Sequence, residues 1–540
     1  MDDTLTRPLE VQFNSQDGKA CLGVIANLPL TDVNRAHGRL LALLDAVNQR
    51  PPPPAMLLQV LEMARAPLVG LQEEVSAHYA FKPLPPNDAE ESALKRVVAA
   101  WRGMAQGYSR VAQMGGGDAA IESQLAMICQ RCIFYAGQML IEHYRARRSL
   151  PPFLWIDLHG YYDTAEEFGL AQTPVIDPLA AGQRSTSCAQ TYAAILLVDL
   201  ADPYSRSPKD LVRMVQWSQR FAHKVAIVRP DDEEGGRGYG VDLMRDQGLL
   251  PVDALAATDT ARLFDTSELG PKLRRIASRL KDGATPASLG LGSDCPADQA
   301  ARLLVPLYRS WSQAARVRRF ERERSSGTLE VAIGLESVHF HITGQEFLQP
   351  EHVRSFTRAD MDALWTFRSQ VDPTQPLMVR SVKLGYTPEQ WQILDRSLNG
   401  FRVRRPAGVA APGVRLDQGQ LLGLKAENLD HFILVRISWL TLETSGDLQL
   451  GLQVIPGAAE GIAVRATGAN VAPSEKYTRG FLLPAVPALQ EPPSLIIPRG
   501  WYQLERIIEG FTDQIWHWRL TGLIQKGPDF DRCTFAAAKV

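Results

Sequence analysis

The first 150 residues carry apolar positions at helical spacing. Segments 32–48, 88–114 and 118–147 each repeat apolar residues every three or four positions, which is the period of an amphipathic helix. Four consecutive prolines at 51–54 break the first of these helices and open a further helix near Ala55, because proline ends a helix and also suits the first turn of the next. Because the connections are short, the pattern predicts an antiparallel helical array over residues 1–150.

Between residues 151 and 286 the pattern becomes mixed. Helical spacing continues over 187–202 and 208–222, whereas short apolar runs at 224–230 and 261–269 have the composition of strands. The segment therefore predicts a helical to mixed α/β region at 151–286.

Beyond residue 287 the chain is dominated by β patterns. A helical run at 297–315 is followed by runs rich in alternating apolar or β-branched residues, such as "FILVRISWLTLE" and "DLQLGLQVI". These patterns predict a small antiparallel barrel over 287–475, interrupted by a helical insertion at about 345–385. Residues 476–540 continue as a β-rich C-terminal extension. The chain as a whole is expected to be a multidomain α+β protein.

Composition narrows the class of protein. Apolar residues make up 45% of the 540 positions and charged residues 22%, which is ordinary for a folded, water-soluble chain. The formal net charge of −2 argues against broad affinity for nucleic acids or anionic membranes. Six cysteines are few for a disulfide framework, and the acidic N-terminus has no apolar signal segment. We therefore expect a cytoplasmic protein without a membrane span.

Five arginines stand close together where the β region begins. They are Arg316, Arg318, Arg319, Arg322 and Arg324, with Glu321 and Glu323 among them. Arginine offers a planar fork that binds phosphate oxygens in pairs and also stacks on rings. Taken alone, such a cluster is more often a solvated charge run paired with its own glutamates.

A second short motif, "DRSLNG", lies between two predicted strands. Asp395 and Ser397 can bind backbone amides or a ligand, and Gly400 permits positive φ or a close backbone approach. Taken alone, the motif is typical of a plain β-turn.

Together, the ordered Arg-x-x-x-Arg and Asp-x-Ser-x-x-Gly motifs in a β context resemble the signature of PilZ domains, bacterial receptors for cyclic di-GMP. The resemblance covers about 315–465 and matches the motif residues Arg318, Arg322, Asp395, Ser397 and Gly400. It implies a PilZ-like β-barrel, with the 345–385 insertion accounting for an unusually wide gap between the motifs.

The resemblance also implies a role for each residue. Arg318 and Arg322 would hold phosphates and guanines of cyclic di-GMP, and Arg319 would stack on a ring. Asp395 would accept hydrogen bonds from guanine, Ser397 would donate one, and Gly400 would allow close approach of the backbone. The ligand would be cyclic di-GMP. Apart from the resemblance, we expect the helical N-terminal half to bind protein partners.

Other motifs carry less weight. Cys129 and Cys132 are interpreted as packed core thiols, and His339 and His341 as two residues on one strand face. We find no hydrolase or kinase motif, so no catalytic residue, metal or cofactor is expected. Two alternatives stay open. One is an interaction scaffold whose barrel has lost its ligand. The other is a single-stranded nucleic-acid binder that uses the arginines and the aromatic tail, Trp501, Trp516 and Trp518.

Overall fold

The computed structural model divides the chain into two compact units. We call Met1–Lys82 with Pro86–Arg318 the helical unit, and Pro83–Pro85 with Arg319–Val540 the barrel unit. The structure describes residues 13–179, 185–230, 238–256, 258–312, 323–350, 375–411, 413–427, 429–467 and 476–538.

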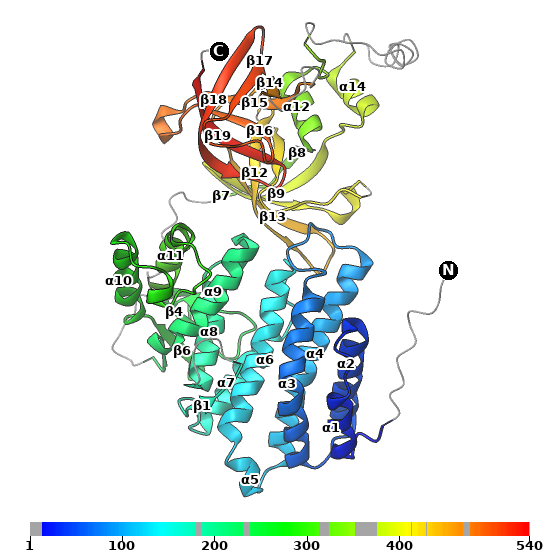
Figure 1. Cartoon of the computed structure of the whole chain (residues 1–540), viewed down its shortest axis with the longest axis vertical. Helices are drawn as coiled ribbons and strands as arrows, with labels where there is room; N and C mark the ends of the chain where they lie inside the picture. Colours follow the sequence, from blue (N-terminus) through cyan, green and yellow to red (C-terminus); the bar gives the residue numbers. More distant parts are fainter. Residues whose placement is uncertain are drawn as a thin grey trace. The chain divides into compact units, whose positions relative to one another are not determined.

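The helical unit begins with an array of long helices, four of which run side by side in Figure 1 (α2, α3, α4 and α6). The helices of this region are α1 (Gly18–Ala26), α2 (Val33–Gln49), α3 (Pro54–Ser76), α4 (Asp88–Met114), α5 (Ala119–Glu122), α6 (Leu125–Arg145) and α7 (Leu154–Glu167). Helix α4 packs against α2, α3 and α6. Its N-cap is Asn87, and a capping box forms there: the side chains of Asn87 and Glu90 each accept a hydrogen bond from the backbone N–H of the other residue. The predicted helical array is confirmed.

The remainder of the helical unit is mixed, as the sequence predicts. Its helices are α8 (Cys188–Leu200), α9 (Pro208–Phe221), α10 (Leu269–Lys281) and α11 (Ala297–Ser312). A four-stranded antiparallel sheet has the order β3 (Ala226–Val228), β6 (Ala261–Asp265), β4 (Tyr239–Asp242) and β5 (Leu250–Pro251). A two-stranded ribbon joins β1 (Val175–Ile176) to β2 (Ser185–Thr186). One continuous apolar core runs from Cys21 to Trp311. Cys129 and Cys132 lie in this core, which confirms their interpretation as packed thiols.

The barrel unit contains two six-stranded antiparallel barrels. The first closes through β8 (Thr328–Ile333), β9 (Glu389–Ser397), β10 (Gly400–Arg405), β13 (Leu448–Val454), β12 (Ile433–Leu442) and β11 (Leu421–Ala426), which returns to β8. A two-residue strand, β7 (Glu323–Arg324), pairs with β9 beyond the end of β8. The side chains of Trp391, Val403, Leu424 and Ile437 are among those that fill the interior. The predicted antiparallel barrel is confirmed.

The β-rich tail forms a closed barrel of its own, drawn in orange to red in Figure 1. Its strands follow the order β14 (Glu460–Ala466), β15 (Thr478–Leu483), β16 (Ser494–Pro498), β19 (Phe530–Ala537), β18 (Ile515–Lys526) and β17 (Ile507–Phe511), which pairs with β14. The segment 460–466, which the sequence pattern groups with the first barrel, is therefore hydrogen-bonded into the second.

A short helix, α12 (Leu335–Thr343), packs against strands of both barrels. The prediction of a strand for this segment is wrong beyond Ile333, so His339 and His341 lie on a helix and both are buried. Gly334, at φ 88°, ends β8 and lets the chain turn into the helix. Periodicity cannot separate a nine-residue buried helix from a buried strand. A second helix, α14 (Leu377–Leu384), begins directly after Pro376.

Among the helices of the described part, none is long and apolar enough to cross a membrane.

Candidate ligand-binding site

The Asp-x-Ser-x-x-Gly motif lies on the β9–β10 hairpin of the first barrel. Asp395 and Ser397 belong to strand β9 itself, and only Leu398 and Asn399 form the turn. Ser397 pairs with Gly400 across the hairpin. The turn predicted for "DRSLNG" is thus shorter than the motif, and the first half of the motif is strand.

An irregularity in β9 sets the direction of these side chains. Ile393 pairs with Val403, but Asp395 pairs with Arg402, so Leu394 is the extra residue of a β-bulge. Val403 is buried in the barrel interior, whereas the side chain of Arg402 is 42% exposed. Because paired residues share a face of the sheet, the bulge turns Asp395 and Ser397 to the outer face. Without it, Asp395 would follow Trp391 and Ile393 into the core.

The two polar side chains are held by neighbours on the same hairpin. Ser397 Oγ lies 3.0 Å from Asn399 Oδ1 and 3.3 Å from the carbonyl oxygen of Gly400. The Asp395 carboxylate lies 3.8 Å from the Arg402 guanidinium, whose other nitrogen donates to Gln449 Oε1 at 2.8 Å. Asp395 is 17% exposed, so its carboxylate can accept further hydrogen bonds from outside the barrel.

Gly400 has a structural reason to be glycine. A Cβ at this position would overlap the carbonyl oxygen of Leu452 on the neighbouring strand β13. The close approach of two backbones, rather than a positive φ, therefore requires glycine here.

The arginines of the other motif, Arg318, Arg319 and Arg322, lie outside the described residues. Glu323, the next described residue, is the first residue of β7. Glu323 pairs with Arg396, and Arg324 pairs with Asp395. The residue that directly follows Arg322 is therefore hydrogen-bonded to the strand that carries Asp395 and Ser397.

Sequence reasoning missed Arg402 as a member of this hairpin face. The signal was present in "FRVRR", where Arg402 and Arg404 alternate with Val403 and Arg405. The alternation separates the outer residue Arg402 from the buried Arg405, which donates two hydrogen bonds to Glu389 at 2.7 Å. Only the pairing register shows that Arg402 lies opposite Asp395.

Three family models match consecutive parts of the chain. Residues 19–231 match the N-terminal domain of "Cyclic-di-GMP receptor FimW", 254–370 match its "middle PilZ domain", and 462–538 match the "FimW C-terminal beta-barrel domain". The PilZ match includes the arginine motif and ends before Asp395. The C-terminal match coincides with the second barrel.

A curated relative supports the same assignment. The cyclic-di-GMP receptor FimW of Pseudomonas aeruginosa is 25% identical over 523 residues, covering 89% of this chain and 83% of the relative. Similarity to a cyclic-di-GMP receptor, which the PilZ-like motifs indicate over about 315–465, thus extends through the helical half and the second barrel.

Proposed function

Because the chain belongs to the FimW family of cyclic-di-GMP receptors, we propose that its first barrel binds cyclic di-GMP. The family is one of receptors rather than enzymes. The residues proposed to form the site are Arg318, Arg319, Arg322, Asp395, Ser397 and Gly400.

The pairing of β7 with β9 carries this proposal. Glu323 and Arg324 of β7 are held beside Arg396 and Asp395 of β9, and Arg322 is the residue that directly precedes Glu323 in the sequence. Arg318 precedes Arg322 by four residues in the sequence. The segment that follows the arginine motif is thus paired with the strand that carries Asp395 and Ser397, which supports one site made from both motifs.

The chemistry of the tethered groups fits the ligand. Cyclic di-GMP presents two phosphates and two guanines, and arginine pairs with phosphate oxygens and with the O6/N7 edge of guanine. Asp395 offers carboxylate oxygens to guanine N–H groups, and the Arg402 guanidinium lies 3.8 Å from them. Ser397 offers a hydroxyl on the same outer face. Gly400 contributes through the backbone, because it allows the hairpin to lie against β13.

Calorimetric titration of cyclic di-GMP into the full chain tests the site. We expect micromolar or tighter binding by the unaltered protein and a loss of about 100-fold or more in the Arg318→Ala/Arg322→Ala variant, because two charge-assisted contacts are removed. The matched control is Arg275→Ala/Arg279→Ala, an exposed arginine pair at the same spacing on α10, which should bind normally.

Two results would overturn the proposal. The first is the absence of any heat of binding at cyclic di-GMP concentrations up to about one hundred micromolar. That result would favour the alternative of an interaction scaffold whose barrel binds no ligand. Unchanged affinity in the Arg318→Ala/Arg322→Ala variant would place the ligand elsewhere in the chain.

The proposal includes a protein partner for the helical unit and a cytoplasmic location. Helix α10 exposes Lys272, Arg274, Arg275, Arg279 and Lys281, and no acidic residue lies within it. A basic face on a chain of net charge −2 suits an acidic protein surface. Six buried, free cysteines suit a reducing compartment.

Cross-linking in cells tests the partner surface on α10. The Arg275→Glu/Arg279→Glu variant should lose the cross-link to the partner while retaining its affinity for cyclic di-GMP. Retention of the cross-link would contradict this role of α10.

A further inference from the structure

The helical unit contains a cavity that the proposed nucleotide site does not use. Side chains of α3, α4, α6, α8 and α9 enclose a space of about 200 Å³. Its exposed rim includes Val69 and Glu73 of α3, so it is open to solvent. A buried cavity of about 150 Å³ is large enough to hold benzene. This space is therefore large enough for one substituted ring system and too small for a dinucleotide.

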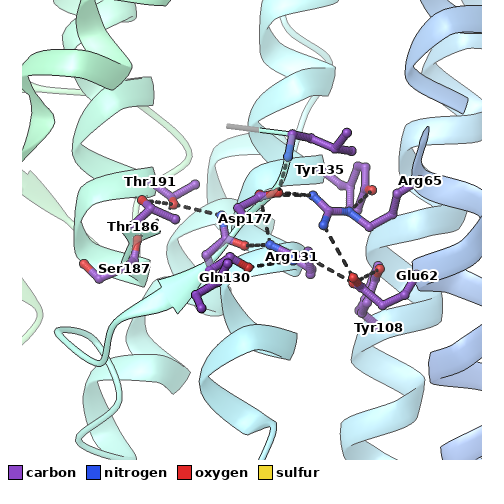
Figure 2. Close-up of polar contacts among 12 residues, drawn as sticks. Glu62, Arg65, Tyr108, Gln130, Arg131, Tyr135, Asp177, Thr186, Ser187 and Thr191 are labelled. Atoms are coloured by element: carbon purple, nitrogen blue, oxygen red, sulfur yellow. Dashed lines mark hydrogen bonds and ion pairs between the residues drawn. The ribbon is translucent and has the colours of Figure 1, made fainter. Parts of the chain in front are cut away.

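One end of the cavity is a closed network of charges, shown in Figure 2. The Asp177 carboxylate accepts hydrogen bonds from Arg65 at 2.9 and 3.0 Å and from Arg131 at 2.9 Å. Arg131 also donates to Glu62 at 3.0 Å. Asp177, Arg65 and Arg131 are each at most 3% exposed. Each of these charges is paired, so this end is rigid and has no charge to offer an ion.

The opposite end is also close to neutral in its buried part. The Glu142 carboxylate is 2% exposed and lies 3.3 Å from the Arg145 guanidinium, and it accepts a 2.6 Å hydrogen bond from Tyr79. Arg145 is shared with the exposed Glu73 at 3.2 Å. An occupant that carried a full charge would have to compete with these pairs.

Several polar groups on the wall are unused. The side-chain amides of Gln138, Gln190 and Gln219 line the cavity and make no hydrogen bond within the described residues. The indole N–H of Trp101, 4% exposed, meets no acceptor with hydrogen-bonding geometry within the described residues. The Nε of Arg145 is unsatisfied as well. A buried donor without an acceptor is unfavourable, so the Trp101 N–H and the Arg145 Nε favour an occupant that accepts hydrogen bonds. The half-buried glutamine amides can both donate to such an occupant and accept from it.

The rest of the wall is apolar. Trp101 and Phe134 supply aromatic surface, and Ile195, Val198 and Val215 supply aliphatic surface. Such a combination of apolar walls with a few convergent polar groups is typical of a small-molecule site. Glutamine amides recognise ring edges that present a donor beside an acceptor.

We propose that the cavity binds an uncharged, planar heterocycle of nucleobase size, with hydrogen-bond donors and acceptors along its edge. The cavity is too small for cyclic di-GMP, and the paired charges at its two ends disfavour an ionic occupant. The unused glutamine amides favour a ring with an amide-like edge over a plain hydrocarbon ring. The receptor would then bind a second small molecule in its helical unit, independently of ligand binding at the barrel.

Thermal unfolding and calorimetry of the full chain, with adenosine, guanosine, cytidine and uridine as probes, test the proposal. At least one probe, at about 100 times its dissociation constant, should raise the Tm of the helical unit by a few degrees. Gln138→Ala should raise the dissociation constant of that probe about tenfold or more, which corresponds to the loss of one hydrogen bond. Because the Gln138 side chain makes no hydrogen bond within the part of the chain that the structure describes, its replacement should leave the Tm without probe unchanged. Gln59→Ala, an exposed glutamine of α3, is the matched control and should bind normally.

Two further variants locate the response. Ala194→Phe places a ring in the cavity and should abolish the probe's effect; if that variant does not fold, Gln138→Ala/Gln219→Ala serves the same purpose. Arg318→Ala/Arg322→Ala should retain the effect, which distinguishes this site from guanosine binding at the barrel. No response to any of the four probes would show a cavity filled by water only and overturn the proposal. A response that survives both cavity variants would also overturn it.

Discussion

His339 is a buried imidazole between aromatic rings. It is 5% exposed, and its ring centroid lies 5.5 Å from that of Phe347 and 5.6 Å from that of Phe481. Burial, together with the charge of Arg479, lowers the pKa of His339 to about 4. The folded barrel unit therefore holds the imidazole neutral.

This depressed pKa predicts acid sensitivity of the barrel unit. An unfolded histidine titrates near 6.5, so the stabilisation is complete above about pH 6.5 and is lost as the pH falls toward 4, up to about 3 kcal/mol. We expect the free energy of unfolding, measured with urea between pH 7.5 and 4.5, to fall less steeply in His339→Gln. The exposed His431 gives a control, His431→Gln. An equal slope in His339→Gln would mean that other groups cause the acid sensitivity.

At the same scale, sequence predicts the motif residues but not their directions. The order of Asp395, Ser397 and Gly400 between two strands is visible in the sequence, and the hairpin follows from it. The bulge at Leu394 is not visible, and it alone decides that Asp395 faces outward. The contact that requires Gly400 comes from Leu452, more than fifty residues later, and sequence spacing does not show such a pairing.

At the scale of elements, the Asp177 network joins α3, α6 and the β1 ribbon. Asp177 follows β1 directly, whereas its partners Arg65 and Arg131 lie on α3 and α6. Figure 2 shows the two guanidinium groups meeting at this single carboxylate. The loop after β1 is thus fixed to two helices by charge-assisted hydrogen bonds.

Asp177→Asn should therefore destabilise the helical unit strongly. Both arginines are at most 3% exposed, and removing one partner of a buried ion pair costs about 3–5 kcal/mol because a buried charge is left uncompensated. Chemical denaturation followed by circular dichroism measures the loss. Lys95→Ala, which removes an exposed pair with Glu91 on α4, should change stability far less. A small effect of Asp177→Asn would mean that Glu62 alone compensates both arginines.

Elements with strong local signals were predictable, and those fixed by distant contacts were not. Helix α4 has an amphipathic pattern and a capping box at Asn87 and Glu90, both readable in sequence. Helix α12 has no side-chain cap, and its helical form follows from packing on β8, β11, β14 and β15. Likewise, β14 belongs to the second barrel because it pairs with β15 and β17. Barrel closure depends on such long-range pairing, which local propensity does not contain.

At the scale of the whole molecule, the receptor proposal requires communication between two units that each have their own core. A ligand shifts a conformational equilibrium only by the difference of its affinities for the two states. The arginine motif is the segment through which cyclic di-GMP can make such a difference, because it lies in the chain between α11 of the helical unit and β7 of the first barrel. Ligand contacts with Arg318 and Arg322 would then constrain that connection.

We expect cyclic di-GMP to change the distance between the two units. The six native cysteines are buried, so dyes can be attached selectively to Gln59→Cys on α3 and Gln514→Cys in the turn after β17, both exposed positions. We expect cyclic di-GMP to change the energy-transfer efficiency of the labelled chain, and the same labels in the Arg318→Ala/Arg322→Ala background to show no change. The unaltered protein could bind the ligand by calorimetry while its energy-transfer efficiency stays constant. A partner would then recognise the ligand-bound surface of the barrel itself. Protein partners should then be sought on the outer face around Asp395 and Arg402 rather than on the helical unit.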